Sequence, residues 1–200
     1  MGFFDWFLIC YLVLFYIIFI SRTIFMRLKG IRPFVLGIGK RIFNALLELS
    51  FFFGLFIWTV EVITHSLDLG FHFFQNPSYY YLFDAVPLKI FGVLLCILAL
   101  FFFISALISF KSSWRVGIDT KQPGELITTG VFSITRNPIF LFIDLYFIGT
   151  FLIYGNVFFL ISVVIVVCGM HSQILKEEKF LEEKYGKAYR EYKEMVRRYI

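Results

Sequence analysis

The chain has 200 residues, of which 60% are hydrophobic, 22% aromatic and only 16% charged, and its mean hydropathy is +0.82. Soluble domains average roughly 45–50% apolar and about 25% charged residues. The composition therefore excludes a soluble globular enzyme and a disordered chain, and it indicates an integral membrane protein. The formal net charge of +5 fits an excess of Lys and Arg in cytoplasmic loops, so we expect contact with membrane lipids and not with nucleic acid.

Five apolar segments predict the helices of a membrane domain, since a bilayer core takes about 20 residues of helix. They cover residues 2–20, 42–63, 86–110, 139–154 and 157–170. The last two segments are shorter than the others and are joined by Gly155-Asn156, a turn dipeptide, so they predict a helical hairpin whose second helix continues beyond the membrane. The expected fold is an all-α polytopic bundle of five transmembrane helices, forming one domain over residues 1–200 from three helices in 1–110 and the segments of 111–200.

The charges between these segments predict one orientation in the membrane. Residues 21–41 and 111–137 carry more Lys and Arg than acids, whereas residues 65–85 contain neither Lys nor Arg. Cytoplasmic loops carry the basic excess. We therefore expect the N-terminus outside and the C-terminus in the cytoplasm.

The last 30 residues hold 14 of the 33 charged side chains, yet they are patterned. Apolar or tyrosine residues recur every three or four positions from Ile174 to Tyr199, which predicts one face of an amphipathic helix. Gly186 is predicted to interrupt this helix, because glycine favours the left-handed conformation after a helical turn. The pattern fits a helix that lies on anionic lipid as well as one that packs against the bundle.

The tripeptide Arg136-Asn137-Pro138 predicts the start of the hairpin. Asparagine is a good N-cap, and proline suits the first helical position because its missing N–H costs nothing there. Unpaired N–H groups and a partial positive charge at a helix start attract an anion, and Arg136 adds to that field. A lipid phosphate and the carboxylate of a ligand are both anions of this kind.

Three ionisable side chains are candidates for a catalytic role: Arg136, Asp144 and Glu178. Asp144 lies inside the hairpin, where an ionisable group is a hypothesis of function, although pairing with a neighbour also explains it. Glu177 and Glu178 follow the last apolar segment by two helical turns, which brings them close to Asn137. No general base is singled out among the three. No metal site is predicted, because the cysteines lie singly in apolar segments and no histidine has a partner at ligand spacing.

Two segments together carry a resemblance to a known family. The first has a glycine and an aromatic residue at 130 and 132, followed by Arg-Asn-Pro-x-aromatic at 136–140. The positions of the second are Glu177, Glu178, Leu181, Tyr185, Gly186, Tyr189, Tyr192, Val196 and Arg198. From about Ser113 to Ile200 the sequence resembles the membrane methyltransferases typified by isoprenylcysteine carboxyl methyltransferase and the phospholipid N-methyltransferases. Its start at Ser113 is similar to bacterial members.

The resemblance implies an S-adenosylmethionine-dependent methyltransferase with a cytoplasmic cofactor site, multi-pass in a bacterial inner membrane, that acts on a lipophilic or lipid acceptor. By position, the cofactor-binding residues would be Gly124, Glu125, Leu126, Ile127, Phe132, Arg136, Asn137, Pro138, Ile139, Phe140 and Glu177. The helix start and Arg136 suit the methionine carboxylate, Phe132 and Phe140 suit adenine, and Glu177 suits a cationic or hydroxyl part of the cofactor.

Departures from the family pattern concern the acceptor. Gln173, expected to contact it, stands where the prenylcysteine enzymes have an arginine that binds the substrate carboxylate, and Asn137 replaces their histidine. We therefore expect an acceptor other than prenylcysteine. Two alternatives stay open: a membrane sterol-type reductase that uses a nicotinamide cofactor, which Lys184-Tyr185-Gly186 also resembles, and a scaffold without enzymatic activity. The sequence does not indicate an oligomeric state.

Overall fold

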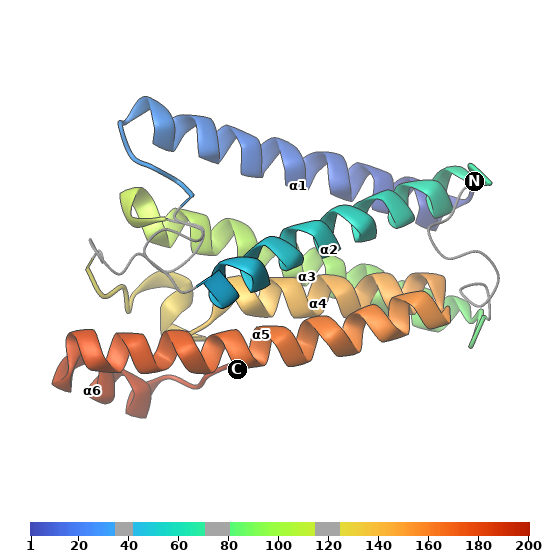
Figure 1. Ribbon diagram of the computed structural model, residues 1–200. Coiled ribbons are helices and arrows are strands. Elements are labelled where there is room, and N and C mark those ends of the chain that lie inside the picture. Colours follow the sequence, from blue (N-terminus) through green and yellow to red (C-terminus); the bar gives the residue numbers. More distant parts are fainter. Residues whose placement is uncertain (35–41, 71–80, 115–124) are drawn as a thin grey trace. The chain divides into compact units, whose positions relative to one another are not determined.

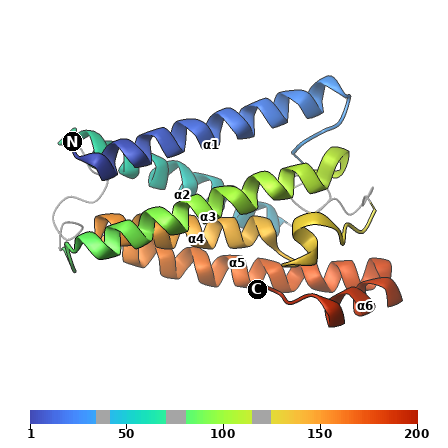
Figure 2. The same cartoon turned by 180° about the vertical axis from the view of Figure 1, so that it is seen from behind.

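The computed structural model describes residues 1–34, 42–70, 81–114 and 125–200, and it gives the backbone alone for residues 42–48 and 112. Within these ranges the chain forms six α-helices and two short 3-10 helices, η2 and η3 (Figures 1 and 2). In chain order they are α1 Phe3–Leu28, α2 Ile42–Leu67, α3 Val86–Phe110, η2 Lys111–Ser113, η3 Gly130–Ser133, α4 Pro138–Tyr154, α5 Val157–Tyr185 and α6 Lys187–Met195.

The apolar helices confirm a multi-pass membrane helix bundle. In the described residues four helices are long and apolar enough to cross a membrane: α1, the part of α2 from Leu49, α3 and α5. The hairpin helix α4 has 17 residues, which is about 25 Å at the α-helical rise and short of a bilayer core of about 30 Å. Of the five predicted transmembrane helices, four are therefore present as candidate spans of full length, and a crossing of the membrane by the short helix α4 stays a prediction. Their orientation in the membrane stays a prediction.

The chain divides into two compact units. The first is Met1–Gln75 with Ser112–Gly124, and the second is Asn76–Lys111 with Glu125–Ile200. In the first unit α1 packs along α2, with a hydrogen bond of 2.8 Å between the hydroxyl oxygens of Tyr16 and Thr59. In the second unit α4 packs against both α3 and α5, and α6 packs against α5. All residues of the candidate site that the structure describes belong to this second unit.

Two glycines allow α3 and α4 to approach closely. A Cβ atom added to Gly92 would lie 2.5 Å from the carbonyl oxygen of Gly149, and one added to Gly149 would lie 2.6 Å from the sulfur of Cys96. Small residues at the contact of two apolar helices let the backbones pack closely. In lipid this packing drives helix association, because no hydrophobic force acts between the helices. This contact fixes α4, and with it the start of the hairpin, against α3.

The turn between α4 and α5 confirms the predicted hairpin. Gly155 ends α4 in the left-handed conformation, with φ of 63°, and an added Cβ atom would collide with the carbonyl oxygen of Phe83. Asn156 caps α5, because its side chain accepts a hydrogen bond of 3.1 Å from the backbone N–H of Phe159. The expected continuation of the second helix is also confirmed: α5 runs without a break to Tyr185 and ends at Gly186, where φ is 54°.

Replacing Gly149 by alanine is expected to loosen the contact between α3 and α4. Alanine normally stabilises a helix relative to glycine by up to about 1 kcal/mol. Here the added methyl group has no space, so we expect a net loss of about 1–3 kcal/mol of stability. Gly169→Ala in α5 is the matched control, since nothing lies within 4 Å of its added Cβ atom. Thermal unfolding in detergent measures both variants. A Gly149→Ala variant as stable as Gly169→Ala would contradict this account of the contact.

Candidate functional site

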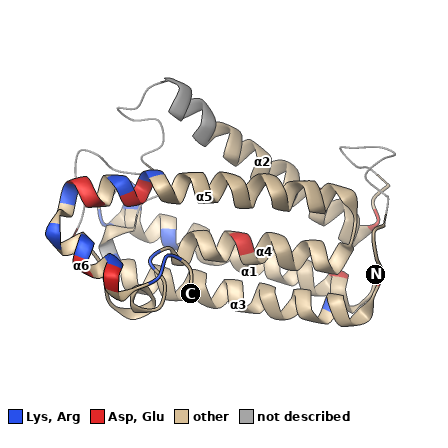
Figure 3. Ribbon diagram, turned by 90° about the horizontal axis from the view of Figure 1, so that it is seen from below, with Lys and Arg blue, Asp and Glu red and all other residues tan. Residues whose placement is uncertain are grey.

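The polar end of the second unit joins three stretches that are distant in sequence. Most charged residues of this unit lie on α6 and on the adjoining end of α5, as the coloured ribbon shows (Figure 3). The loop before α4 and the tail after α6 meet there, since the backbone N–H of Arg136 donates a hydrogen bond of 3.1 Å to the carbonyl of Arg197. The hydroxyl of Thr135 donates one of 3.2 Å to the carbonyl of Arg198. The tail is therefore held along the start of the hairpin.

A buried carboxylate, that of Glu178 in α5, lies at the centre of this junction. Its side chain is 7% exposed. Arg198 donates from Nη2 to Oε2 at 2.8 Å and from Nε to both oxygens at 3.2 Å. Nη2 of Arg136 lies 3.0 Å from Oε1, and Nδ2 of Asn137 donates to the same oxygen at 3.4 Å. We call these four side chains the Glu178 cluster. With two guanidinium groups around one carboxylate, the cluster has one positive charge in excess.

Within the cluster, Glu178 and the two arginines stabilise one another in their charged forms. The hydrogen bonds with Glu178 raise the pKa of the Arg198 guanidinium above its ordinary value, in spite of some loss of solvent. A carboxylate that is held by two arginines has no tendency to take up a proton at neutral pH. A catalytic role of Glu178 stays a prediction, although a carboxylate that two arginines already hold is poorly suited to serve as a general base.

Asn137 lies at the predicted N-cap position, but its side chain does not cap the helix. The helix begins at Pro138, and no side-chain hydrogen bond caps it. The side-chain amide instead donates to Glu178 and, at 3.2 Å, to the carbonyl of Arg198. The prediction of a side-chain cap is therefore wrong. The physical reason is that a hydrogen bond to a buried carboxylate is charge-assisted and stronger than one to a neutral backbone group.

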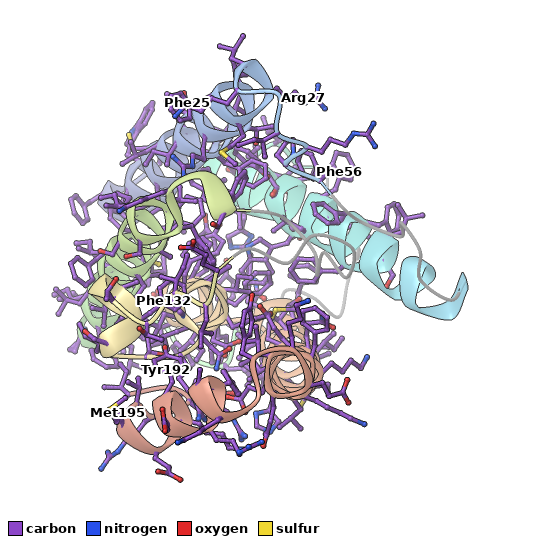
Figure 4. All side chains as sticks on the ribbon, turned by 90° about the vertical axis from the view of Figure 1, so that its left-hand side faces the viewer. Phe25, Arg27, Phe56, Phe132, Tyr192 and Met195 are labelled. Carbon is purple, nitrogen blue, oxygen red and sulfur yellow. The ribbon has the colours of Figure 1, made fainter. Side chains whose placement is uncertain are left out.

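The tyrosine face of the C-terminal segment packs against protein. Tyr192 of α6 donates a hydrogen bond of 2.6 Å to the carbonyl of Phe132 in η3 (Figure 4). The ring of Phe132 meets that of Phe110 edge-on at 5.0 Å. Burial raises the pKa of Tyr192 to about 12, so it stays a donor at neutral pH. Met195, on the same helix, is 77% exposed. The amphipathic helix is thus confirmed, with Gly186 as its interruption, and its tyrosine face is used to dock on η3.

Five of the predicted cofactor-binding residues, 136–140, form the start of α4 and the chain just before it. Pro138 is fully buried, and Ile139 and Phe140 are half-buried in the first turn. Glu177 is half-buried beside Glu178. The others are Leu126 and Ile127, both half-buried, Glu125, which is exposed, Phe132, which is buried, and Gly124, which lies outside the described residues. Gln173, the predicted acceptor contact, is half-buried on α5.

Two residues of the junction have roles that the sequence reasoning did not assign. Arg198 is the last position of the second motif. The signal for its role is that it is an arginine, whereas the three motif positions before it are tyrosine or valine. Thr135 is completely buried and donates to the tail. Nothing in the sequence distinguishes it from the threonines of an ordinary loop.

Comparison with known proteins adds one finding. The family model described as phospholipid methyltransferase matches residues 88–188. The match includes most of α3, which the sequence analysis had left outside the resemblance, together with all of α4 and α5. No curated protein and no solved structure matches the chain.

Removing the carboxylate of Glu178 is expected to release the tail. In a Glu178→Ala variant the Arg136 guanidinium, which is 7% exposed, would be left buried without its partner. Such a loss costs roughly 3–5 kcal/mol. The readouts are thermal stability in detergent and the rate at which trypsin cleaves near Arg197. Glu183→Ala on the same helix is the control, because Glu183 is 67% exposed and forms only a weak pair with Lys179. Equal stability of the two variants would show that the cluster does not hold the tail.

Proposed function

The chain belongs to the phospholipid methyltransferase family, and on this basis we propose that it transfers a methyl group from S-adenosylmethionine, bound at the start of α4, to a lipophilic acceptor that arrives through the bilayer. Members of this family are S-adenosylmethionine-dependent membrane methyltransferases. The assignment favours this activity over the reductase and the scaffold that the sequence alone left open.

The observation that carries the proposed cofactor site is an unsatisfied donor in the Glu178 cluster. Nε of Arg136 is buried and has no hydrogen-bond partner in the part of the chain that the structure describes. A buried guanidinium N–H without a partner is costly, and an anionic ligand would satisfy it. The excess positive charge of the cluster and the helix start at Pro138 act in the same direction. We assign this position to the carboxylate of the methionine part of the cofactor.

The aromatic and acidic residues nearby suit the remaining parts of the cofactor. The ring of Phe132 is already packed against Phe110, whereas Phe140 is half-buried in the first turn of α4. Phe140 is therefore the better candidate to stack on adenine. Glu177 is half-buried on α5 beside the cluster, where its carboxylate can accept hydrogen bonds from hydroxyl groups or hold a cationic group.

Bound S-adenosylmethionine supplies an electrophilic methyl group on a sulfonium centre. The residues of the chain contribute position and a dry environment. The cluster fixes the start of α4 and the tail, and the buried tyrosines of α6 cover the junction from outside. Displacement at a methyl group depends on the alignment of the reacting atoms, so a rigid site of this kind can account for a large part of the rate.

The apolar surroundings support a lipophilic acceptor. Many apolar side chains of α3 and α5 are exposed, among them Phe101 at 53% and Ile165 at 65%. In a membrane such faces meet lipid, so a molecule dissolved in the bilayer reaches the hairpin without crossing water. Gln173 carries no charge and offers no ionic anchor for a carboxylate such as that of prenylcysteine.

Cofactor binding tests the proposed site directly. We expect detergent-purified protein to bind S-adenosylmethionine and S-adenosylhomocysteine in calorimetric titrations. We expect no saturable binding of reduced nicotinamide adenine dinucleotide phosphate. A Glu177→Ala variant is expected to bind about 10–100-fold more weakly, since a hydrogen bond to a charged group contributes roughly 1.5–3 kcal/mol. Glu183→Ala is the matched control. Unchanged affinity in Glu177→Ala would remove Glu177 from the site, and binding of the nicotinamide alone would reinstate the reductase.

The nature of the acceptor can be tested with the cofactor as the only label. Membranes containing the protein are incubated with S-adenosylmethionine that carries tritium in its methyl group, and the products are partitioned between chloroform and water. We expect the label that depends on the protein to enter the chloroform phase, because the acceptor dissolves in the bilayer. Label confined to the aqueous phase would show that the acceptor is water-soluble.

A further inference from the structure

The one charged side chain of α4, that of Asp144, has a carboxyl oxygen without a hydrogen-bond partner in the part of the chain that the structure describes. Asp144 lies in the middle of this otherwise uncharged helix, is 7% exposed, and its Oδ1 atom has no hydrogen-bond partner among the described residues. A buried carboxyl group without a partner is destabilising in a protein interior and more so in an apolar hairpin. Its burial is therefore not explained by the fold, and a ligand that donates a hydrogen bond would account for it.

The helix register relates Asp144 to the cofactor site. Asp144 follows Asn137 by seven residues, which is nearly two full turns, so both lie on the same face of α4 at a separation of about 10 Å along the axis. His171 precedes Glu178 by the same seven residues on α5. Because α4 and α5 run antiparallel from a tight turn, the contact of Asn137 with Glu178 sets Asp144 level with His171.

The C-terminal tail also reaches the part of the hairpin where Asp144 and His171 lie. The residue after Arg198 is Tyr199, whose hydroxyl lies 2.8 Å from Nδ1 of His171, with the two rings stacked at 6.2 Å. Burial raises the pKa of Tyr199, and the negative charge of Asp144 raises it further. The carboxyl group of Asp144 therefore lies within electrostatic range of Tyr199. A carboxyl group, an imidazole and a phenol form a polar layer two turns deeper in the hairpin than the Glu178 cluster.

The two acids of the hairpin differ in what they can do. Glu178 is neutralised by Arg136 and Arg198, so it cannot usefully accept another proton. Asp144 has no cationic partner among the described residues, and a carboxylate in apolar surroundings gains from a proton or a hydrogen-bond donor. Of the two acids, Asp144 is therefore the one that can accept a proton or a hydrogen bond.

We propose that Asp144 contacts the methyl acceptor and determines its chemical class: the nucleophile is an O–H, S–H or N–H group that donates a hydrogen bond to this carboxylate, and not a carboxylate. The proposal rests on the methyltransferase function given above. In the reaction, the bond between the methyl carbon and the sulfonium sulfur breaks and its electron pair stays on sulfur. The acceptor atom forms a new bond to the methyl carbon with its lone pair, and its proton passes to Asp144. A carboxylate acceptor is disfavoured because it would bring a second negative charge to a site of low dielectric.

Two probes with the same chain and opposite charge test the proposal. Purified protein saturated with S-adenosylhomocysteine is titrated with hexadecylamine and with palmitate, which both present a 16-carbon chain, and the two dissociation constants are compared. We expect the wild type to prefer the amine by about tenfold or more, as one favourable charge contact predicts. Asp144→Asn should abolish the preference, and Asp144→Glu, which keeps the charge, should retain most of it. Glu183→Gln, an exposed acid far along α5, should leave it unchanged.

Each result decides the proposal. Equal binding of the two probes by the wild type, a preference for palmitate, or a preference that survives Asp144→Asn would overturn it. Asp144→Asn replaces a buried carboxyl group by an amide of the same shape, so its melting temperature should not fall. If that variant does not fold, the comparison of the probes on the wild type and on Asp144→Glu still decides. Binding of S-adenosylhomocysteine is measured in the same samples: its absence from the wild type would contradict the proposed function, whereas its loss in Asp144→Asn alone would place Asp144 at the cofactor.

Discussion

The neutralisation of one buried carboxylate connects the membrane hairpin to the polar tail. Glu178 takes its partners from the loop before α4, from the first residue ahead of that helix and from the tail. A shift of the loop or of the tail would separate an arginine from this carboxylate, and a shift of Asn137 would break a hydrogen bond to it. Buried ion pairs contribute little net stability compared with apolar packing, but they are strict about geometry. The cluster is therefore best understood as a device that sets positions, and the unsatisfied Nε of Arg136 is the place where a ligand joins it.

The packing of the apolar helices in the second unit sets the position of this cluster along α4 and α5. Gly92 and Gly149 let α3 and α4 touch through their backbones, and the turn at Gly155 and Asn156 fixes α5 against α4. Position along α5 then follows from helix geometry alone. Two levels of polar side chains result, one at the start of the hairpin and one two turns deeper, and each receives one residue of the tail.

Local rules explain what the sequence could predict. The apolar lengths, the Gly155-Asn156 turn, the continuation of α5 and the break at Gly186 each depend on a few neighbouring residues, and all are present. The site could be predicted only to the level of segments. Glu177 and Glu178 look alike in the sequence, but a rotation of about 100° per residue buries the second and leaves the first half-buried. The departure of the Asn137 amide from its capping role depends on Glu178, 41 residues away, and the contact between Gly92 and Gly149 depends on the packing of two helices. Neither is written in a local pattern.

The reversal of the chain at Gly186 has a consequence for the order of assembly. Asn137 and Arg198, which meet in the junction, are separated by 61 residues, a span that divides into steps of 41 and 20 residues at Glu178. Closing a loop costs entropy that grows only with the logarithm of its length, but here each step is a helical turn-back and not a flexible loop. Once the α4–α5 hairpin exists, the tail needs only a local search over one glycine turn. The membrane part can thus form first and act as a template, and the polar junction closes on it afterwards from the aqueous side.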